Sequence, residues 1–380
     1  MKASRALGIT GFSLIAVTYG MARFSWGLML PAIVKDVPLS TETAGILSAC
    51  SFAAYCVAIV SVPAITKYVG PRWVAATAAF LAAVGLLILA FSFSPLMLAA
   101  GLSVAGLSPG IASPSLATAV SLRVTDNQQP RMNTFINAGT SAGIILSVPV
   151  LLFLPGGWRA ACLLFSGIAL VCLLPILRYL PDDRGTNQEQ TKSRWRRLPG
   201  AAMLRLVAIA FASGIISAAW WSFGPQLLRQ HANVDAQTIS LLWMVAGGAG
   251  IFGILAGPIA DRIGMNQVWR GSLLLMALPL VVLAWADEPS WWLFPTVAMS
   301  GAGYVILSGV LLVCSVSATH STPASGVGLV FFMLAAGQVA GSVLFAQLYA
   351  RTSVETALLA FSIPGFLMML FTPANRHQNA

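Results

Sequence analysis

The chain has 380 residues, of which 58% are hydrophobic and only 8% are charged, and its formal net charge is +10. A soluble domain carries about 25% charged residues, so 21 basic and 11 acidic side chains are too few to cover a water-facing surface of this size. This composition excludes a soluble enzyme, a nucleic-acid-binding protein and a disordered chain, and it indicates an integral membrane protein.

Apolar segments follow one another along the whole chain, and each is about as long as the roughly 20 residues that a helix needs to cross the hydrocarbon core. Membrane-spanning strands are a poor alternative, because the apolar runs do not alternate with a period of two residues. We therefore predict an all-α integral membrane protein with twelve transmembrane helices, at residues 7–33, 43–65, 73–93, 95–121, 131–154, 159–180, 202–228, 237–260, 267–286, 290–316, 323–349 and 354–373.

The basic residues predict how these helices are oriented. An even number of spans places both termini on one side of the membrane, and most Lys and Arg residues fall in the loops of that side. Because cytoplasmic loops are enriched in Lys and Arg, we expect both termini to be cytoplasmic. The positive net charge is then an orientation signal, and it implies no nucleic-acid partner.

A polar segment at residues 181–200 divides the chain almost in the middle, which predicts an N-terminal six-helix bundle (1–180), a cytoplasmic linker and a C-terminal six-helix bundle (201–380). Landmarks of the first half recur in the second at nearly constant spacing: FSWG at 24–27 and WSFG at 221–224, Ala105-Gly106 and Ala302-Gly303, AGTSAG at 138–143 and AGQVAG at 336–341, and the loops that end at Gly70 and Gly264. Such repeats are common in transporters and predict two bundles related by a pseudo-two-fold axis along the membrane normal.

The loop GPIADRIG at 257–264, placed within this half-repeat, resembles the signature loop of the major facilitator superfamily. The strings YGMARFSWGLMLPAI (19–33), GLSPGIASPS (106–115) and NAGTSAGIILSVP (137–149) are similar to a bacterial branch near the cyanate-permease-like carriers. The resemblance covers essentially the whole chain. It implies a monomer in the bacterial inner membrane that works by alternating access around a central cavity lined by the first, second, fourth and fifth helices of each half.

Three departures from that family pattern argue against a proton-driven drug antiporter. Lys67 stands where the first-half loop of the family carries an Asp, and Leu102 stands where the fourth helix of many drug exporters carries an Arg. The fifth span has only part of the antiporter glycine-proline motif, at Gly139, Gly143 and Pro149.

Arg23 is the charged residue that we expect deepest in the membrane, because no predicted span has an Asp or Glu in its interior. A buried arginine is costly unless it faces a cavity or a partner, and its planar fork suits a carboxylate. Tyr19, Arg23 and Trp26 share one helical face. Arg23 could instead bond main-chain carbonyls at a broken helix or extend toward the membrane surface.

The repeat places Trp220 at the position equivalent to Arg23, which predicts a cavity that is charged on one side and aromatic on the other. Helix packing is the alternative for each tryptophan and for each polar residue considered. The candidate substrate-binding residues are Tyr19, Arg23, Trp26, Tyr55, Asn137, Trp220, Trp221 and Gln338. We expect the paired glycines Gly139 and Gly143, and Gly337 and Gly341, to permit close helix crossings.

The resemblance also implies gate residues, since the loop carboxylate of this family contacts a helix N-terminus of the opposite bundle when the inner side is closed. Helix N-termini attract anions, so Asp261 should form a strong latch and Lys67 a weak one. We expect the fifth span to be the partner of Asp261, with Arg123 close by. The candidate gate residues are Lys67, Arg131, Asp261 and Arg262.

We predict a secondary transporter that moves a small organic or inorganic anion, with efflux of neutral or amphiphilic compounds as the alternative. The predicted partners are this small molecule and the lipid bilayer. An enzyme is disfavoured because the sequence shows no nucleophile-base pair. No cofactor or metal site is expected, because the five cysteines form no CxxC pair and lie in apolar stretches.

Overall fold

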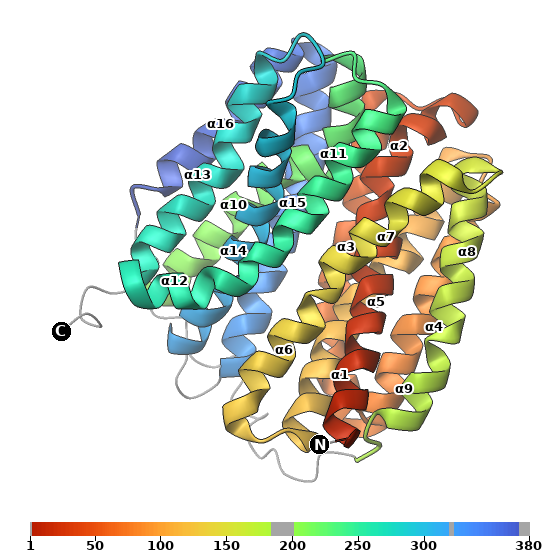
Figure 1. The fold of residues 1–380 in the computed structure, drawn as a ribbon, viewed down its shortest axis with the longest axis vertical. Coiled ribbons are helices and arrows are strands. Elements are labelled where there is room, and N and C mark those ends of the chain that lie inside the picture. The colour runs from red at the N-terminus through yellow and green to blue at the C-terminus, as the bar shows by residue number, and fades with distance from the viewer. Residues whose placement is uncertain (1, 184–200, 319–322, 372–380) are drawn as a thin grey trace. The chain divides into compact units, whose positions relative to one another are not determined.

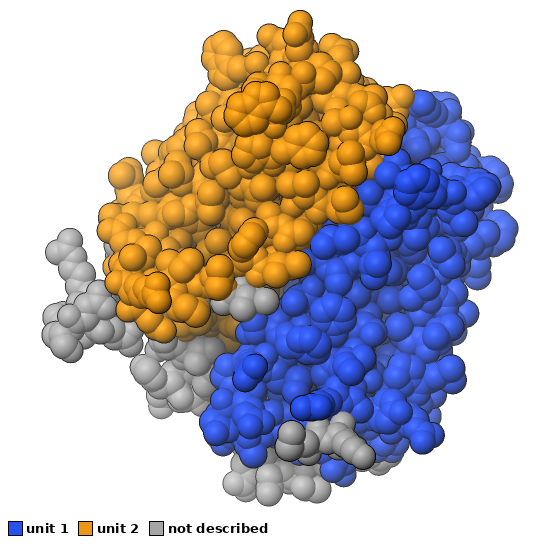
Figure 2. Space-filling model, viewed as in Figure 1, with its two compact units in different colours: residues 1–186 blue, residues 187–380 orange. Residues whose placement is uncertain are grey.

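The computed structural model describes residues 2–183, 201–318 and 323–371, and its regular elements within these ranges are all helices (Figure 1). The chain divides into two compact units, residues 1–186 and 187–380, which Figure 2 colours separately. Of the linker predicted at 181–200, residues 184–200 lie outside the described residues.

Unit 1 begins with a first span in which two α-helices flank a π-helix. Within the unit, α3 and α4 pack on α5, α4 also packs on α8, and the π-helix η1 packs on α7. The elements are α1 (Lys2–Ile15), η1 (Ala16–Phe24), α2 (Ser25–Asp36), α3 (Thr41–Val69), α4 (Pro71–Ala90), α5 (Pro95–Arg123), the short 3₁₀ turn η2 (Asp126–Gln128), α6 (Gln129–Asn137), α7 (Gly139–Phe153), α8 (Gly157–Val171) and α9 (Leu173–Tyr179).

Unit 2 repeats these packing relations with its own helices. Its α10 packs on α15, α11 packs on α14, and α13 packs on both α14 and α16. The elements are α10 (Ala201–Gln230), α11 (Ala236–Ala249), the 3₁₀ segment η4 (Gly250–Leu255), α12 (Ala256–Ile263), α13 (Met265–Ala284), α14 (Leu293–Ala318), α15 (Pro323–Arg351) and α16 (Val354–Met368).

The described residues contain 11 helical segments that are long and apolar enough to cross a membrane, and α16 forms a shorter apolar helix at the position of the twelfth predicted span. The predicted all-α, multi-spanning fold is confirmed. Four spans that we expected as regular α-helices are modified within their length. The first contains η1, the fifth divides into α6 and α7, the sixth divides into α8 and α9, and the eighth contains η4. Glycine, which is unfavourable in a helix interior, occurs at or beside the irregular places of the first, fifth and eighth spans.

Gly70 and Gly264 give the internal repeat a structural counterpart. Gly70 connects α3 to α4 with φ 89° and ψ 154°, and Gly264 connects α12 to α13 with φ 88° and ψ 146°. Residues that carry a Cβ atom rarely adopt such positive φ values, so both turns require glycine. The helices that follow, α4 and α13, each have 20 residues. The repeat seen in the sequence therefore corresponds to one local backbone arrangement built twice.

Glycine pairs allow close helix crossings in both units. A Cβ atom on Gly143 of α7 would lie 2.9 Å from the Cα of Gly20 in η1, and a Cβ atom on Gly337 of α15 would lie 3.0 Å from the Cα of Gly214 in α10. Small residues at such crossings let helix backbones approach and pack within the membrane. The prediction that Gly139, Gly143, Gly337 and Gly341 permit close crossings is confirmed, because an added Cβ atom at each would collide with the main chain of a neighbouring helix. The two crossings involve equivalent helices of the repeat.

Polar side chains at the helix ends connect the helices within each unit. In unit 1, one cluster of such contacts is centred on Asp36. Its Oδ2 accepts hydrogen bonds from Trp158 Nε1 (2.8 Å) and Arg159 Nη1 (2.6 Å). Arg159 also donates through Nη2 to the carbonyl of Ser92 at 2.9 Å. This cluster joins the end of α2, the residues after α4 and the start of α8.

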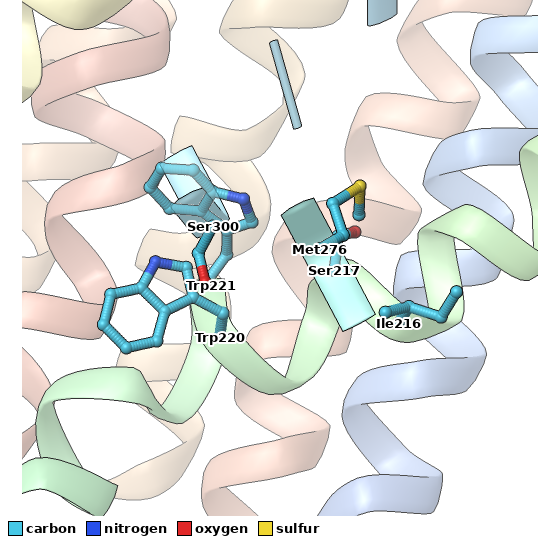
Figure 3. A pocket seen from close by; sticks show the side chains of 6 residues that line it. All are labelled: Ile216, Ser217, Trp220, Trp221, Met276 and Ser300. Atoms are coloured by element: carbon cyan, nitrogen blue, oxygen red, sulfur yellow. The ribbon is translucent and has the colours of Figure 1, made fainter. Parts of the chain in front are cut away.

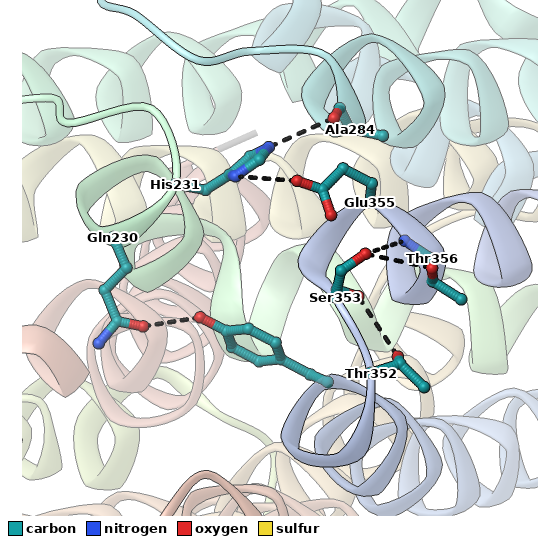
Figure 4. Close-up of polar contacts among 8 residues, drawn as sticks. Gln230, His231, Ala284, Thr352, Ser353, Glu355 and Thr356 are labelled. Atoms are coloured by element: carbon teal, nitrogen blue, oxygen red, sulfur yellow. Dashed lines mark hydrogen bonds and ion pairs between the residues drawn. The ribbon is translucent and has the colours of Figure 1, made fainter.

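His231 is the centre of a comparable cluster of polar contacts in unit 2 (Figure 4). Its Nδ1 lies 3.9 Å from the Glu355 carboxylate, and its Nε2 lies 3.3 Å from the carbonyl of Ala284. The hydroxyl of Tyr349 donates to Gln230 Oε1 at 2.8 Å. These contacts bring together the ends of α10, α13 and α15 and the start of α16.

The close crossing of α10 and α15 predicts a destabilising substitution. Valine at Gly337 would collide with the main chain of Phe211, so we expect Gly337→Val to lower the free energy of unfolding by about 1–3 kcal/mol. The matched control is Gly271→Val on α13, where an added Cβ meets no atom within 4 Å. Thermal unfolding of the purified protein in detergent measures both variants. Equal melting temperatures for the two would contradict this account of the crossing.

Candidate functional site

Arg23 lies in the irregular part of the first span, in the last turn of η1. A π-helical turn inserted in an α-helix is uncommon and occurs frequently at functional sites. Arg23 is only 6% exposed. Its side chain is therefore buried, contrary to the alternative in which it extends to the membrane surface. The predicted face of Tyr19, Arg23 and Trp26 assumed regular α-helical spacing. The wider π-helical turn changes which of these residues lie next to Arg23.

Four aromatic rings of unit 1 surround the guanidinium group of Arg23. Its Cζ atom lies 4.5 Å from the ring centroid of Tyr55, 4.8 Å from Phe52, 5.4 Å from Phe24 and 5.7 Å from Tyr19. Ring faces attract cations, by up to about 2 kcal/mol where the pair is desolvated. These four ring contacts therefore stabilise the positive charge of the guanidinium group.

Hydrogen bonds fix the two tyrosines of this cluster. The Tyr19 hydroxyl is 2.8 Å from Ser113 Oγ on α5 and 3.4 Å from the Tyr55 hydroxyl on α3. The predicted residues Tyr19, Arg23 and Tyr55 are thus brought together from η1 and α3. Trp26 Nε1 donates a hydrogen bond to Ser48 Oγ on α3 at 2.7 Å, and its role in substrate binding stays a prediction. Asn137 is exposed at the end of α6.

The predicted residues of unit 2 also form a cluster, which consists of aromatic rings. Trp243 of α11 lies between two tryptophans of α10, with centroid distances of 5.8 Å to Trp220 and 5.4 Å to Trp221. Trp221 makes an edge contact with Tyr304 of α14 at 5.6 Å. Gln338 of α15 donates through Nε2 to the Tyr304 hydroxyl at 3.4 Å. This cluster is uncharged, in contrast to the one around Arg23.

A small cavity adjoins this aromatic cluster, with room for about one water-sized molecule (Figure 3). Two of its lining residues, Trp220 and Ser300, have a buried polar atom (Nε1 and Oγ) with no hydrogen-bond partner among the described residues. Burial of such a group without a partner costs about 1–3 kcal/mol. The cavity is lined by Ile216, Ser217, Trp220, Trp221, Met276 and Ser300.

Sequence reasoning missed several members of both clusters. Phe52 could have been found, because it lies three residues before Tyr55 and so shares its helical face. Ser113, Trp243 and Tyr304 belong to helices distant in sequence, and only the packing of those helices brings them to the site. No sequence signal distinguished them from other residues of their spans.

The candidate gate residues lie at helix ends, where Lys67 is in the last turn of α3 and Arg262 in the last turn of α12. All four are exposed: Lys67, Arg131, Asp261 and Arg262. Their roles as gates stay predictions. Arg123, which we expected close to the partner of Asp261, forms an ion pair within unit 1, with Asp183 at 3.0 Å.

The aromatic rings around Arg23 predict that two substitutions of Tyr55 differ in their effect on stability. Tyr55→Phe keeps the ring nearest to the guanidinium, whereas Tyr55→Leu removes it. We expect Tyr55→Leu to be less stable than Tyr55→Phe by about 1–2 kcal/mol, because a desolvated cation–π contact is lost. Thermal unfolding checks the difference. Stability that falls as much in the Phe variant as in the Leu variant would assign the effect to the hydroxyl and not to the ring.

Comparisons with known proteins agree with this architecture. The Major Facilitator Superfamily model matches residues 12–342. The uncharacterized transporter YycB of Bacillus subtilis (strain 168) is 25% identical over 249 residues, which cover 63% of this chain and 59% of YycB. Two crystal structures of the nucleoside transporter NupG share the fold: a mutant form at 14% identity with a TM-score of 0.77, and a second structure at 16% identity with a TM-score of 0.73. They cover 96% and 97% of this chain, and 98% of NupG in both cases. Because the family model covers most of its length, the chain belongs to the Major Facilitator Superfamily of membrane transporters.

Proposed function

We propose that this transporter moves a small organic or inorganic anion, and that Arg23 binds the negative charge of the substrate. The observation that carries the proposal is a buried guanidinium group held among four aromatic rings in a π-helical turn. The guanidinium group carries a positive charge. A permanent charge at this depth is costly, and residues of this kind in membrane helices are commonly functional.

The chemistry of the site favours a flat anion. A guanidinium group presents N–H donors in one plane and can bind a carboxylate through two parallel hydrogen bonds. The rings of Tyr19 and Tyr55 offer apolar faces beside the charge, on which the organic part of a substrate can stack. Their hydroxyl groups add polar contacts at the same place.

The distribution of acidic residues disfavours a cationic substrate. Along the described spans, carboxylates occur only near helix ends, as with Asp36 at the end of α2, Glu42 at the start of α3 and Asp261 near the end of α12. A cation bound beside Arg23 would meet repulsion and no compensating carboxylate in the span interior. This supports anion transport over multidrug cation export.

Further parts of the proposal follow the family pattern. The protein works by alternating access as a monomer in the bacterial inner membrane, with cytoplasmic termini and with Lys67, Arg131, Asp261 and Arg262 as gate residues. A second candidate, efflux of neutral or amphiphilic compounds, is favoured by the uncharged aromatic cluster of unit 2. The NupG structures bear on the fold alone at their low identity.

Substitution of Arg23 tests the anion proposal. Purified protein is titrated with acetate, benzoate and cyanate, and with the cation tetraphenylphosphonium, while ligand-induced thermal stabilisation is measured. We expect Arg23→Gln to weaken binding of the best anion at least roughly tenfold, which corresponds to the loss of about 1.4 kcal/mol. Arg23→Lys should retain part of the affinity, because it keeps the charge and loses the planar fork.

The control is Arg351→Gln, which removes an exposed positive charge at the end of α15. It should leave anion binding unchanged, and counterflow of labelled benzoate or cyanate in proteoliposomes should follow the same order of variants. Anion binding that survives Arg23→Gln, or stabilisation by the cation alone, would contradict the proposal.

A further inference from the structure

One serine of α5 contacts another span, whereas two serines close to it on α5 bond within their own helix. Ser108 and Ser115 donate to the carbonyls three residues before them, at 2.7 and 2.8 Å, as serines in helices commonly do. Ser113 instead has its Oγ 2.8 Å from the Tyr19 hydroxyl of η1. Its side chain therefore connects α5 to the first span at the aromatic cluster around Arg23.

The direction of this hydrogen bond follows from the hydroxyl groups present. A phenol has one O–H, and Tyr19 donates it to the Tyr55 hydroxyl at 3.4 Å. Ser113 therefore donates to Tyr19. The contact with Tyr55 is longer than the roughly 2.5–3.0 Å typical of O–H···O bonds. Ser113 thus makes the stronger of the two hydrogen bonds that hold the Tyr19 ring.

Tyr19 is also the most accessible aromatic residue of this cluster. The other three aromatic residues are 3–5% exposed, whereas Tyr19 and Ser113 are half-buried. The Tyr19 ring centroid lies 5.7 Å from Cζ of Arg23. A molecule that reaches the guanidinium group within unit 1 therefore has the Tyr19 ring as its most accessible aromatic neighbour.

We infer that Ser113 is a specificity-determining residue of the Arg23 site: it holds the Tyr19 ring beside the guanidinium group, and so favours carboxylates that carry a flat aromatic group. The carboxylate contacts Arg23 and the aromatic group stacks on Tyr19. A ring that is already fixed allows this without the loss of affinity that comes from ordering a mobile side chain. Ser113 acts through Tyr19 and is therefore a positioning residue. The inference deepens the proposed function and rests on it.

Benzoate and cyclohexanecarboxylate measure this preference, because they are similar in size and only benzoate has a flat ring. Isothermal titration of the purified protein gives both affinities. We expect wild type to bind benzoate about three- to tenfold tighter, as expected for one aromatic stacking contact. Ser113→Ala should lower this ratio to within about twofold of one, because the Tyr19 ring becomes mobile. Ser113→Thr keeps the hydroxyl group and should keep the ratio.

The matched control is Ser115→Ala, which removes a hydroxyl group that donates to the Ala112 carbonyl of the same helix. It should keep the wild-type ratio. Equal affinities for the two acids in wild type, or a ratio as high in Ser113→Ala as in Ser115→Ala, would overturn the inference.

A double-substitution cycle distinguishes positioning from a general structural defect. If Ser113 acts through the Tyr19 hydroxyl, then Ser113→Ala, Tyr19→Phe and the double variant should give the same ratio, because each breaks the same hydrogen bond. Tyr19→Leu removes the ring itself and should give a ratio of about one. Losses that add up in the double variant would show that Ser113 acts independently of Tyr19 and would overturn the inference.

Arg23→Gln separates this inference from the proposed function. It should weaken benzoate and cyclohexanecarboxylate by the same factor and leave their ratio unchanged. If Arg23→Gln has no effect while Ser113→Ala removes the preference, the role of Arg23 fails and that of Ser113 stands. If Arg23→Gln weakens both acids while Ser113→Ala keeps the preference, the role of Ser113 fails alone. No binding of either acid would overturn both.

Discussion

The structure of unit 1 depends on one constraint: the guanidinium group of Arg23 is buried within a membrane-spanning helix, and its neighbours must stabilise it. A positive charge buried at this place is costly unless the surrounding structure stabilises it. The π-helical turn at Ala16–Phe24 brings the rings of Tyr19 and Phe24 to the group, and α3 contributes Phe52 and Tyr55. The hydrogen bond between Tyr19 and Ser113 then connects the cluster to α5.

The two units share features of the backbone but differ in the side chains that form their central clusters. Glycines allow η1 to approach α7 in unit 1 and α10 to approach α15 in unit 2, and Gly70 and Gly264 form matching turns. These features belong to the main chain and recur in both halves. The side chains presented on the equivalent helices differ: one unit presents a cation among phenyl and phenol rings, and the other presents uncharged indoles.

Much of the fold could be predicted because membrane insertion imposes simple rules on sequence. Runs of apolar residues indicated the spans, and the lone charge within them identified Arg23. The cluster members Ser113, Trp243 and Tyr304 were not predicted, because their roles depend on which helices pack together. The π-helix was also missed, since it depends on tertiary packing and has no periodic signature. The hydrogen bond from Trp26 to Ser48 could not be predicted either, and a role of Trp26 in substrate binding stays a prediction.

The central claim is that the carboxylate of a bound substrate contacts Arg23. Solid-state NMR can measure the distance from ¹³C-carboxyl benzoate to the ¹⁵N-labelled guanidinium groups in lipid bilayers, with Arg23→Lys used to assign the signal. The account predicts a separation of about 4 Å or less, as in a hydrogen-bonded arginine-carboxylate pair. Bound benzoate whose carboxyl carbon shows no dipolar coupling to the Arg23 guanidinium nitrogens would contradict it.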